Sequence, residues 1–87
     1  MHIVFSGKVQ GVGFRFHARQ VAQDLGLIGW AANEADRTVV CEVQGNIMDV
    51  DAFYDQMKDG PPLSRVYNAH TTEIPLLTHE TSFEIIY

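Results

Sequence analysis

The sequence is poor in cysteine and in basic residues. Its 87 residues include one cysteine, Cys41, so no internal disulfide can form. Six lysines and arginines stand against eleven aspartates and glutamates, which gives a net charge of −5. Nucleic-acid-binding proteins usually carry an excess of basic residues, so this balance argues against a nucleic-acid partner. An anion would have to be bound by local geometry against an unfavourable overall field.

Long apolar runs and targeting signals are also missing. No apolar segment is long enough to span a bilayer, and the first residues lack the basic and apolar regions of a signal peptide. The absence of disulfides and leader segments is typical of cytoplasmic proteins. We therefore expect a cytoplasmic protein with no membrane partner.

Metal ligands are sparse as well. The four histidines lack the spacing of a zinc site: His2, His17, His70 and His79. Cys41 lies on the apolar side of a predicted strand, where packing in the core is favoured over a role as nucleophile. The sequence thus predicts no metal site.

The length and composition fit one folded domain. Hydrophobic residues make up 46% of the chain and charged residues 20%, which are ordinary values for a globular protein. No repeat, linker or low-complexity stretch divides the chain. We expect residues 1–87 to form a single domain with one continuous core.

Five segments have the pattern of β-strands. Apolar side chains alternate at Ile3, Phe5 and Val9, and again at Val39 and Cys41. The segment 65–73 is polar and poorly periodic, which predicts an edge strand. The predicted strands cover residues 3–9, 28–33, 38–44, part of 65–73 and 83–87.

Two segments have a helical period. The first stripe consists of Phe14, Ala18, Val21, Ala22 and Leu25, and the second of Val50, Phe53 and Met57. Gly26 ends the first helix, whereas Asn46 is a good N-cap for the second and Gly60 begins its stop. The resulting order is strand, helix, strand, strand, helix, strand, with a C-terminal strand added. This βαββαβ order predicts an α+β, ferredoxin-like two-layer sandwich whose antiparallel sheet is covered on one face by both helices.

The segment between the first strand and the first helix is the most informative. Gly11 and Gly13 allow positive φ angles, which can turn successive N–H groups inward around an anion. The N-terminus of the helix behind them adds unpaired N–H groups, and Arg15 in its first turn carries a planar fork of donors that suits two phosphate oxygens. A glycine pair alone also fits a plain tight connection, and the Gly-Lys-Ser/Thr ending of a nucleotide-binding P-loop is missing.

The complete segment, Gly7-Lys8-Val9-Gln10-Gly11-Val12-Gly13-Phe14-Arg15, closely resembles the signature of the acylphosphatase family. A second match follows in Gly26-Leu27-Ile28-Gly29-Trp30-Ala31-Ala32-Asn33, where the family has a glycine, a tryptophan and an asparagine. The resemblance covers nearly the whole chain. It implies a ferredoxin-like fold, a monomer, and hydrolysis of the carboxyl–phosphate bond of a small-molecule acyl phosphate to a carboxylate and inorganic phosphate, without a cofactor.

The resemblance also implies roles for individual residues. Arg15 matches the family's phosphate-binding arginine and Asn33 its water-orienting asparagine. The backbone N–H groups of the phosphate cradle belong to Gln10, Gly11, Val12, Gly13 and Phe14. The chain departs from the family after Asn33, where Arg37 follows Asp36 in place of the usual Asp-Gly turn. Arginine tolerates positive φ poorly, so we expect a different turn type, and a one-residue change of register would turn Asn33 to the other face.

Ferredoxin-like folds also serve as RNA-recognition and ligand-binding domains, so the fold leaves a non-catalytic phosphate- or ligand-binding module open. RNA binding favours aromatic side chains on the exposed strands, and the predicted strand at 38–44 has none. An acylphosphatase-like domain also stands at the start of the much longer hydrogenase-maturation carbamoyltransferases. An assay with an acyl phosphate separates the enzyme from these alternatives.

Overall fold

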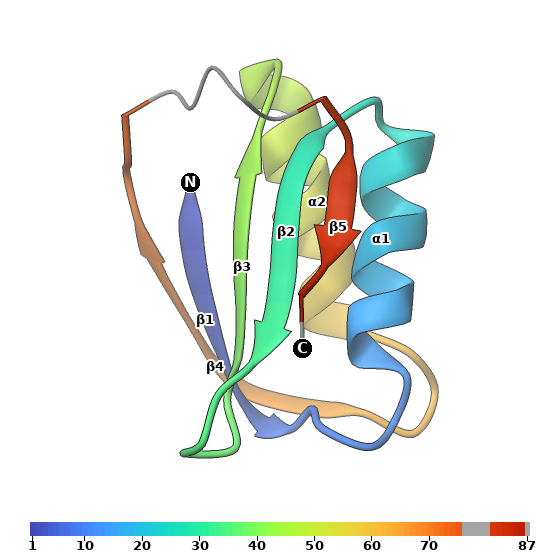
Figure 1. Ribbon diagram of the computed structural model, residues 1–87. Coiled ribbons are helices and arrows are strands. Elements are labelled where there is room, and N and C mark those ends of the chain that lie inside the picture. Colours follow the sequence, from blue (N-terminus) through green and yellow to red (C-terminus); the bar gives the residue numbers. More distant parts are fainter. Residues whose placement is uncertain (76–80, 87) are drawn as a thin grey trace.

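The computed structural model describes residues 1–75 and 81–86 (Figure 1). Along the chain lie β1 (His2–Lys8), α1 (Phe14–Asp24), β2 (Ile28–Asn33), β3 (Val39–Gln44), α2 (Ile47–Asp59), β4 (Arg65–Thr72) and β5 (Phe83–Ile85). This order confirms the predicted one. His79 and the last residue of the predicted C-terminal strand, Tyr87, lie outside the described residues.

The five strands form one sheet in the order β4-β1-β3-β2-β5. The predicted edge position of β4 is confirmed, and the apolar strands β1 and β3 occupy inner positions. Strands β4, β1, β3 and β2 pair antiparallel, as predicted, but β5 pairs in parallel with β2, so the sheet is mixed. The reason is topological, because β4 ends at the end of the sheet where β2 begins, and β5 therefore runs in the same direction as β2.

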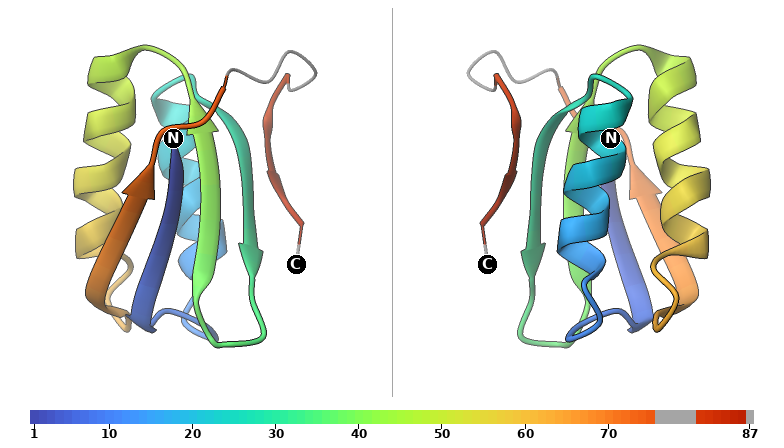
Figure 2. Two further views of the ribbon diagram at one scale, coloured as in Figure 1. Left: turned by 90° about the vertical axis from the view of Figure 1, so that its left-hand side faces the viewer. Right: turned by 90° about the vertical axis from the view of Figure 1, so that its right-hand side faces the viewer.

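Both helices lie on one face of the sheet, and the right-hand view of Figure 2 looks onto them with the sheet behind. The predicted apolar stripes of helix and strand meet in the core between the two layers. Core side chains include Ile3, Phe5, Val39, Cys41 and Val43 from the strands and Phe14, Ala18, Val21, Ala22, Val50, Phe53 and Met57 from the helices. Burial raises the pKa of the Cys41 thiol above its usual range. The core placement predicted for this cysteine is thus confirmed.

The helix ends follow from local chemistry. Gly26 has a φ of 70°, its N–H donates to Gln23 O, and the N–H of Leu27 donates to Ala22 O, which together form a Schellman motif. The side chain of Asn46 accepts a hydrogen bond of 2.9 Å from the N–H of Met48 at the start of α2. Gly60 ends α2 with a φ of 65°. These three predicted boundary residues are confirmed. No helix in the described part of the chain is long and apolar enough to cross a membrane.

Candidate active site

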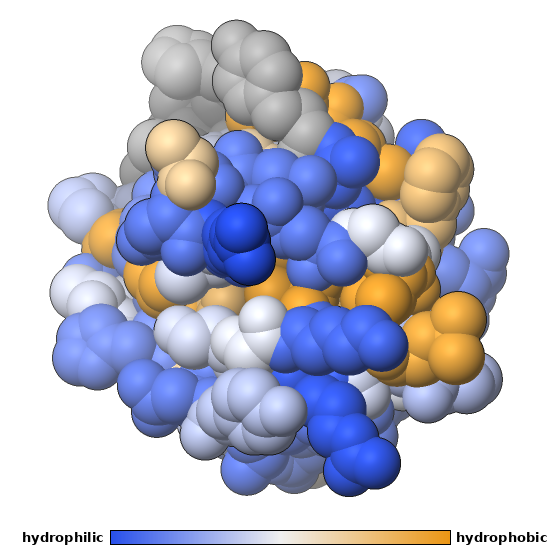
Figure 3. All heavy atoms as spheres, turned by 90° about the horizontal axis from the view of Figure 1, so that it is seen from below, coloured by the Kyte–Doolittle hydropathy of each residue, from blue (hydrophilic) through white to orange (hydrophobic). Residues whose placement is uncertain are grey.

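Two connections meet at one end of the sheet. Strands β1 and β2 both pair antiparallel with β3, so they run in the same direction and their carboxyl ends lie at the same end of the sheet. The loop that follows β1 leads into α1, and the hairpin that follows β2 begins directly after Asn33 (Figure 1). Figure 3 views this end directly, where hydrophobic atoms form a band across the middle of a mostly hydrophilic surface. The topology therefore brings the glycine-rich loop and Asn33 side by side.

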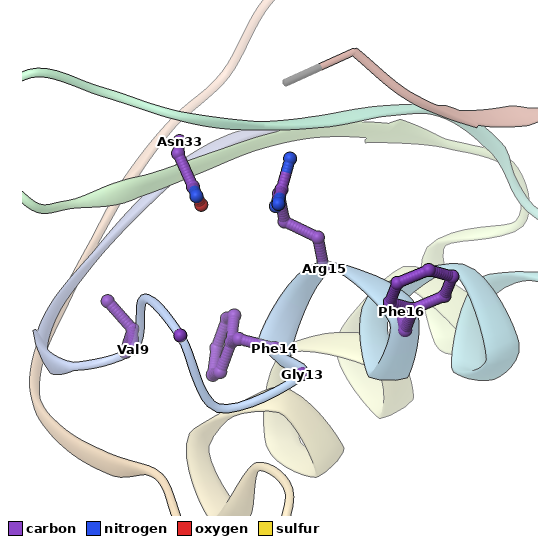
Figure 4. Close-up of a pocket in the computed structure, with 7 residues that line it drawn as sticks. Val9, Gly13, Phe14, Arg15, Phe16 and Asn33 are labelled. Carbon is purple, nitrogen blue, oxygen red and sulfur yellow. The ribbon is translucent and has the colours of Figure 1, made fainter.

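A cavity of about 150 Å³ lies between these two connections. This is smaller than the roughly 300–1,000 Å³ of pockets for drug-sized ligands. Its lining consists of Val9, Gly11, Gly13, Phe14, Arg15, Phe16 and Asn33. Figure 4 shows the side chains of Arg15, from α1, and Asn33, from β2, converging over the cavity. Five of the seven predicted site residues thus share one lining.

The other two predicted site residues are placed differently. The side chain of Val12 packs against the hydrophobic core, and the side chain of Gln10 is directed to the hairpin, where it forms hydrogen bonds. Neither residue belongs to the lining of the cavity. The role predicted for both residues involves their backbone N–H groups, so it stays a prediction.

The loop depends on glycine for its backbone conformation. Gly11 and Gly13 have φ angles of 73° and 78°, in the left-handed region that other residues avoid. A Cβ at either position would meet no atom of the described residues within 4 Å, so the requirement is conformational rather than steric. Gly13 occupies the N-cap position of α1 and accepts a hydrogen bond of 3.0 Å from the N–H of His17. The loop therefore turns directly into the helix.

The N-terminus of α1 carries a partial positive charge that no acidic residue of its first turn neutralises. No side-chain hydrogen bond from the described residues caps it, and its first turn contains no acidic residue. Arg15 adds a full positive charge, is the one charged residue in the described lining, and has no carboxylate partner within the described part of the chain. An uncapped helix start with a nearby guanidinium is suited to binding an anion.

Asn33 contributes a neutral polar group to the same cavity. It is the last residue of β2 and pairs in register with Val39, which is buried beneath the helices. Its side chain therefore faces the helical layer, and its Oδ1 atom is buried without a hydrogen-bond partner among the described residues. Buried polar atoms are nearly always hydrogen-bonded, so an unpartnered oxygen over a cavity indicates a position for a small polar molecule.

The turn after Asn33 corrects one expectation. Arg37 adopts a φ of 73°, so an arginine does occupy the left-handed position, and it is the one non-glycine residue with positive φ in the described ranges. The N–H of Glu34 donates to Thr38 O over 2.9 Å and the N–H of Arg37 donates to Glu34 O over 3.1 Å, which closes the hairpin. The Asp36 carboxylate accepts hydrogen bonds from the side chain and the backbone N–H of Thr38, and these lower its pKa. Because these bonds hold the turn, the register is kept and Asn33 faces the cavity.

Two residues of the lining, Val9 and Phe16, were not among the predicted site residues. Phe16 is 63% exposed at the edge of the cavity, and the Arg19 guanidinium lies 5.0 Å from the centre of its ring. The available signal was its absence from the apolar stripe of α1, which leaves an aromatic side chain exposed beside Arg15. Arg19 is not part of the lining. Within residues 1–75 and 81–86, no three His, Cys, Asp or Glu side chains are grouped so as to hold a metal ion.

The profile of the acylphosphatase family matches residues 1–85. The chain belongs to the acylphosphatase family. A curated acylphosphatase from Oceanobacillus iheyensis is 40% identical over 82 residues, which are 93% of this chain and 90% of the relative. The structure is also similar to the crystal structure of acylphosphatase from Bacillus subtilis, with a TM-score of 0.94 and 34% sequence identity. The alignment covers 99% of this chain and 96% of the Bacillus subtilis chain. Acylphosphatases are hydrolases that act on acyl phosphates and release phosphate, and the comparisons support this activity for the chain.

The fold also occurs within a longer protein. Full-length HypF, crystallised in a phosphate- and nucleotide-bound form, matches with a TM-score of 0.90 and 31% identity. The match covers 99% of this chain but only 11% of HypF. The acylphosphatases named above are instead covered over most of their length.

Proposed function

We propose that the cavity between the loop and Asn33 binds the phosphate group of an acyl phosphate and directs a water molecule to its phosphorus atom. The backbone N–H groups of residues 10–14 and the Arg15 guanidinium would hold the non-bridging oxygens. The observation that carries the proposal is the convergence, over one small cavity, of the Arg15 guanidinium and the Asn33 Oδ1 atom, neither of which has an ionic or hydrogen-bonding partner among the described residues. The first group suits an anion and the second suits a water molecule.

The reaction needs little more than positioning and charge stabilisation. The oxygen of the water forms a bond to phosphorus while the bond between phosphorus and the acyl oxygen breaks, and the carboxylate leaves with the electron pair. A carboxylate is a good leaving group, so no strong general acid is required. Phosphoryl transfer of this kind passes through a loose transition state whose charge lies on the phosphate oxygens, where Arg15 and the helix N-terminus would stabilise it.

Asn33 would orient the attacking water. Its Oδ1 accepts a hydrogen bond from the water, which turns the lone pair of the water oxygen toward phosphorus. An amide does not take up the proton, so the proton passes to a phosphate oxygen of the substrate or to solvent. The side chain would therefore act on turnover and hardly on the affinity for phosphate.

The enzyme is proposed to act as a cytoplasmic monomer on a small molecule, with no nucleic-acid or membrane partner and no metal. The single cysteine is free and buried, which is consistent with a protein that forms no disulfides. The net charge of −5 supports a small-molecule substrate over a nucleic acid. The alternative, a non-catalytic phosphate-binding module, keeps phosphate binding but lacks turnover.

The test is an assay of the purified protein with acetyl phosphate and benzoyl phosphate, with and without EDTA. We expect hydrolysis of both substrates, unchanged by the chelator. Binding of inorganic phosphate without turnover would favour the non-catalytic module, and an EDTA-induced loss restored by Mg²⁺ or Zn²⁺ would contradict the metal-free reaction.

Asn33→Ala tests the positioning of the water. We expect kcat to fall about 10²-fold, because a misplaced nucleophile loses most of the benefit of orientation, while the inhibition constant of inorganic phosphate stays unchanged. Asn68→Ala is a matched control, since Asn68 lies exposed on the edge strand β4. Full turnover in Asn33→Ala would rule out the proposed role.

A further inference from the structure

The side chain of Gln10 links the loop to the hairpin. Its Nε2 atom donates to Glu34 O over 2.9 Å and to Thr38 O over 2.9 Å. Gln10 is half-buried, and the two contacts span 24 and 28 positions of the chain. One amide group of the loop after β1 is therefore bound to both sides of the turn, at the residue that follows β2 and the residue that precedes β3.

The two acceptor carbonyls lie next to Asn33. Glu34 follows Asn33 directly, and Thr38 precedes Val39, the residue that pairs with Asn33 in register. The same pair closes the turn, because the N–H of Glu34 donates to Thr38 O. Gln10 thus holds the base of the hairpin at the residues that flank Asn33 and its partner.

We propose that the Gln10 side chain is a positioning residue, which sets the placement of Asn33 relative to the phosphate cradle. The inference rests on the proposed function, because it assigns Gln10 the task of aligning the two halves of that site. The cradle belongs to the segment that contains Gln10, whereas Asn33 belongs to a separate strand. The Oδ1 atom of Asn33 has no hydrogen-bond partner among the described residues, so its position depends on the backbone that carries it.

The chemistry of the contact is specific to glutamine. A terminal NH₂ group offers two donors, which match the two carbonyl oxygens. A glutamate at this position would face both oxygens with a carboxylate that only accepts hydrogen bonds. Protonation would restore one donor, so the effect of such a substitution depends on pH.

The hairpin has support besides Gln10. Six residue pairs join β2 to β3, and the turn has its own backbone hydrogen bonds. Loss of the Gln10 side chain is therefore expected to leave the hairpin folded but free to shift relative to the loop. Such a shift would misplace Asn33 without removing the groups that bind phosphate.

The decisive experiment is a double-mutant cycle of Gln10→Ala and Asn33→Ala. In the wild-type background we expect Gln10→Ala to lower kcat about tenfold, with the inhibition constant of inorganic phosphate changed by less than about twofold. In the Asn33→Ala background the same change should have no further effect, because the group that Gln10 positions is already gone. Gln20→Ala is the matched control, since Gln20 is exposed on α1 and its side chain donates to Asp24, one turn further along the same helix.

Gln10→Glu gives a second test that does not depend on the folding of the alanine variant. Relative to the wild type, its kcat should rise as the pH falls through the pKa of the new carboxyl group, where the protonated form regains a donor. If the Gln10 side chain merely fills space, the ratio of the kcat of Gln10→Glu to the kcat of the wild type does not change with pH.

Independent, multiplicative losses in the cycle would overturn the inference, and so would a loss of phosphate affinity in Gln10→Ala as large as the loss of kcat. A wild-type protein without acyl phosphate hydrolysis would instead overturn the proposed function, so the two failures are distinguishable.

Discussion

The two helices begin in opposite ways. At α2, the side chain of Asn46 accepts a hydrogen bond from the N–H of Met48, and Asp49 places a negative charge in the first turn. At α1, the N-cap position is Gly13, which has no side chain, and neither a capping hydrogen bond from the described residues nor an acidic first-turn residue is present. Every helix start carries unpaired N–H groups and a partial positive charge. The described residues supply a capping side chain and an acidic residue at α2 and neither at α1, where we propose that a phosphate group takes their place.

The start of α1 is held by packing instead of a cap. Phe14, its first residue, is buried and makes an edge-to-face contact with Phe5 of β1, with ring centres 5.1 Å apart. Such aromatic contacts stabilise by about 0.5–1.5 kcal/mol beyond the burial of area, which is comparable to an N-cap. The helix can therefore forgo a capping side chain.

Arg15→Ala removes the full charge at the start of α1 and has the largest expected effect. Turnover should be abolished, and the affinity for inorganic phosphate should fall by an amount equivalent to about 1.5–3 kcal/mol, the contribution of a charge-assisted hydrogen bond. Arg15→Lys should also be poor, because it keeps the charge but loses the planar fork. Steady-state kinetics and calorimetric titration with phosphate provide the measurements, and turnover near the wild-type level in Arg15→Ala would refute the assignment.

Gly13→Asp makes the start of α1 resemble that of α2. The new carboxylate should compete with phosphate and lower its affinity at least tenfold, and the loss should shrink at high salt because the repulsion is screened. Gly13→Asn is the neutral control, as asparagine tolerates the left-handed backbone and carries no charge. If the two variants bind phosphate equally well, the partial charge of this helix start plays no part in binding.

Asn46→Ala has the smallest expected effect and concerns only the other helix. It should lower the free energy of unfolding by about 1 kcal/mol through loss of the cap. Because α2 contributes no residue to the lining of the cavity, kcat and KM should stay as in the wild type. Denaturant unfolding and the acyl phosphate assay measure the two quantities. A change in kcat or KM would show that the N-terminus of α2 influences the cavity, and the two helix starts could then not be treated as independent.

Local patterns in the sequence predicted most of the fold. The apolar stripes of Phe14 to Ala22 and Val50 to Met57 identified both helices, since a helix of this kind must bury one side. The polar character of β4 predicted its edge position, and the placement of Arg15 and Asn33 at one cavity agrees with the family resemblance. These features depend on periodicity or on short motifs.

The features that were missed depend on contacts between distant segments. The parallel pairing of β5 with β2 involves three residue pairs and follows from the direction in which the chain returns. The residues around Gln10 in the sequence do not indicate its hydrogen bonds to the hairpin, because any glutamine has the same two donors. Arg37 occupies a left-handed position because the hairpin bonds around it outweigh a local cost of about 1–2 kcal/mol.

The burial of Cys41 in the central strand β3 has a practical consequence. The only thiol of the chain is fully enclosed, and its raised pKa disfavours the reactive thiolate, so alkylating reagents should reach it only when the sheet opens. The rate at which Cys41 is labelled would then report the rate at which the folded protein opens. A ligand that binds only the folded state lowers this labelling rate in proportion to the fraction of protein that it occupies. Ligands can therefore be ranked by affinity without following the reaction they undergo.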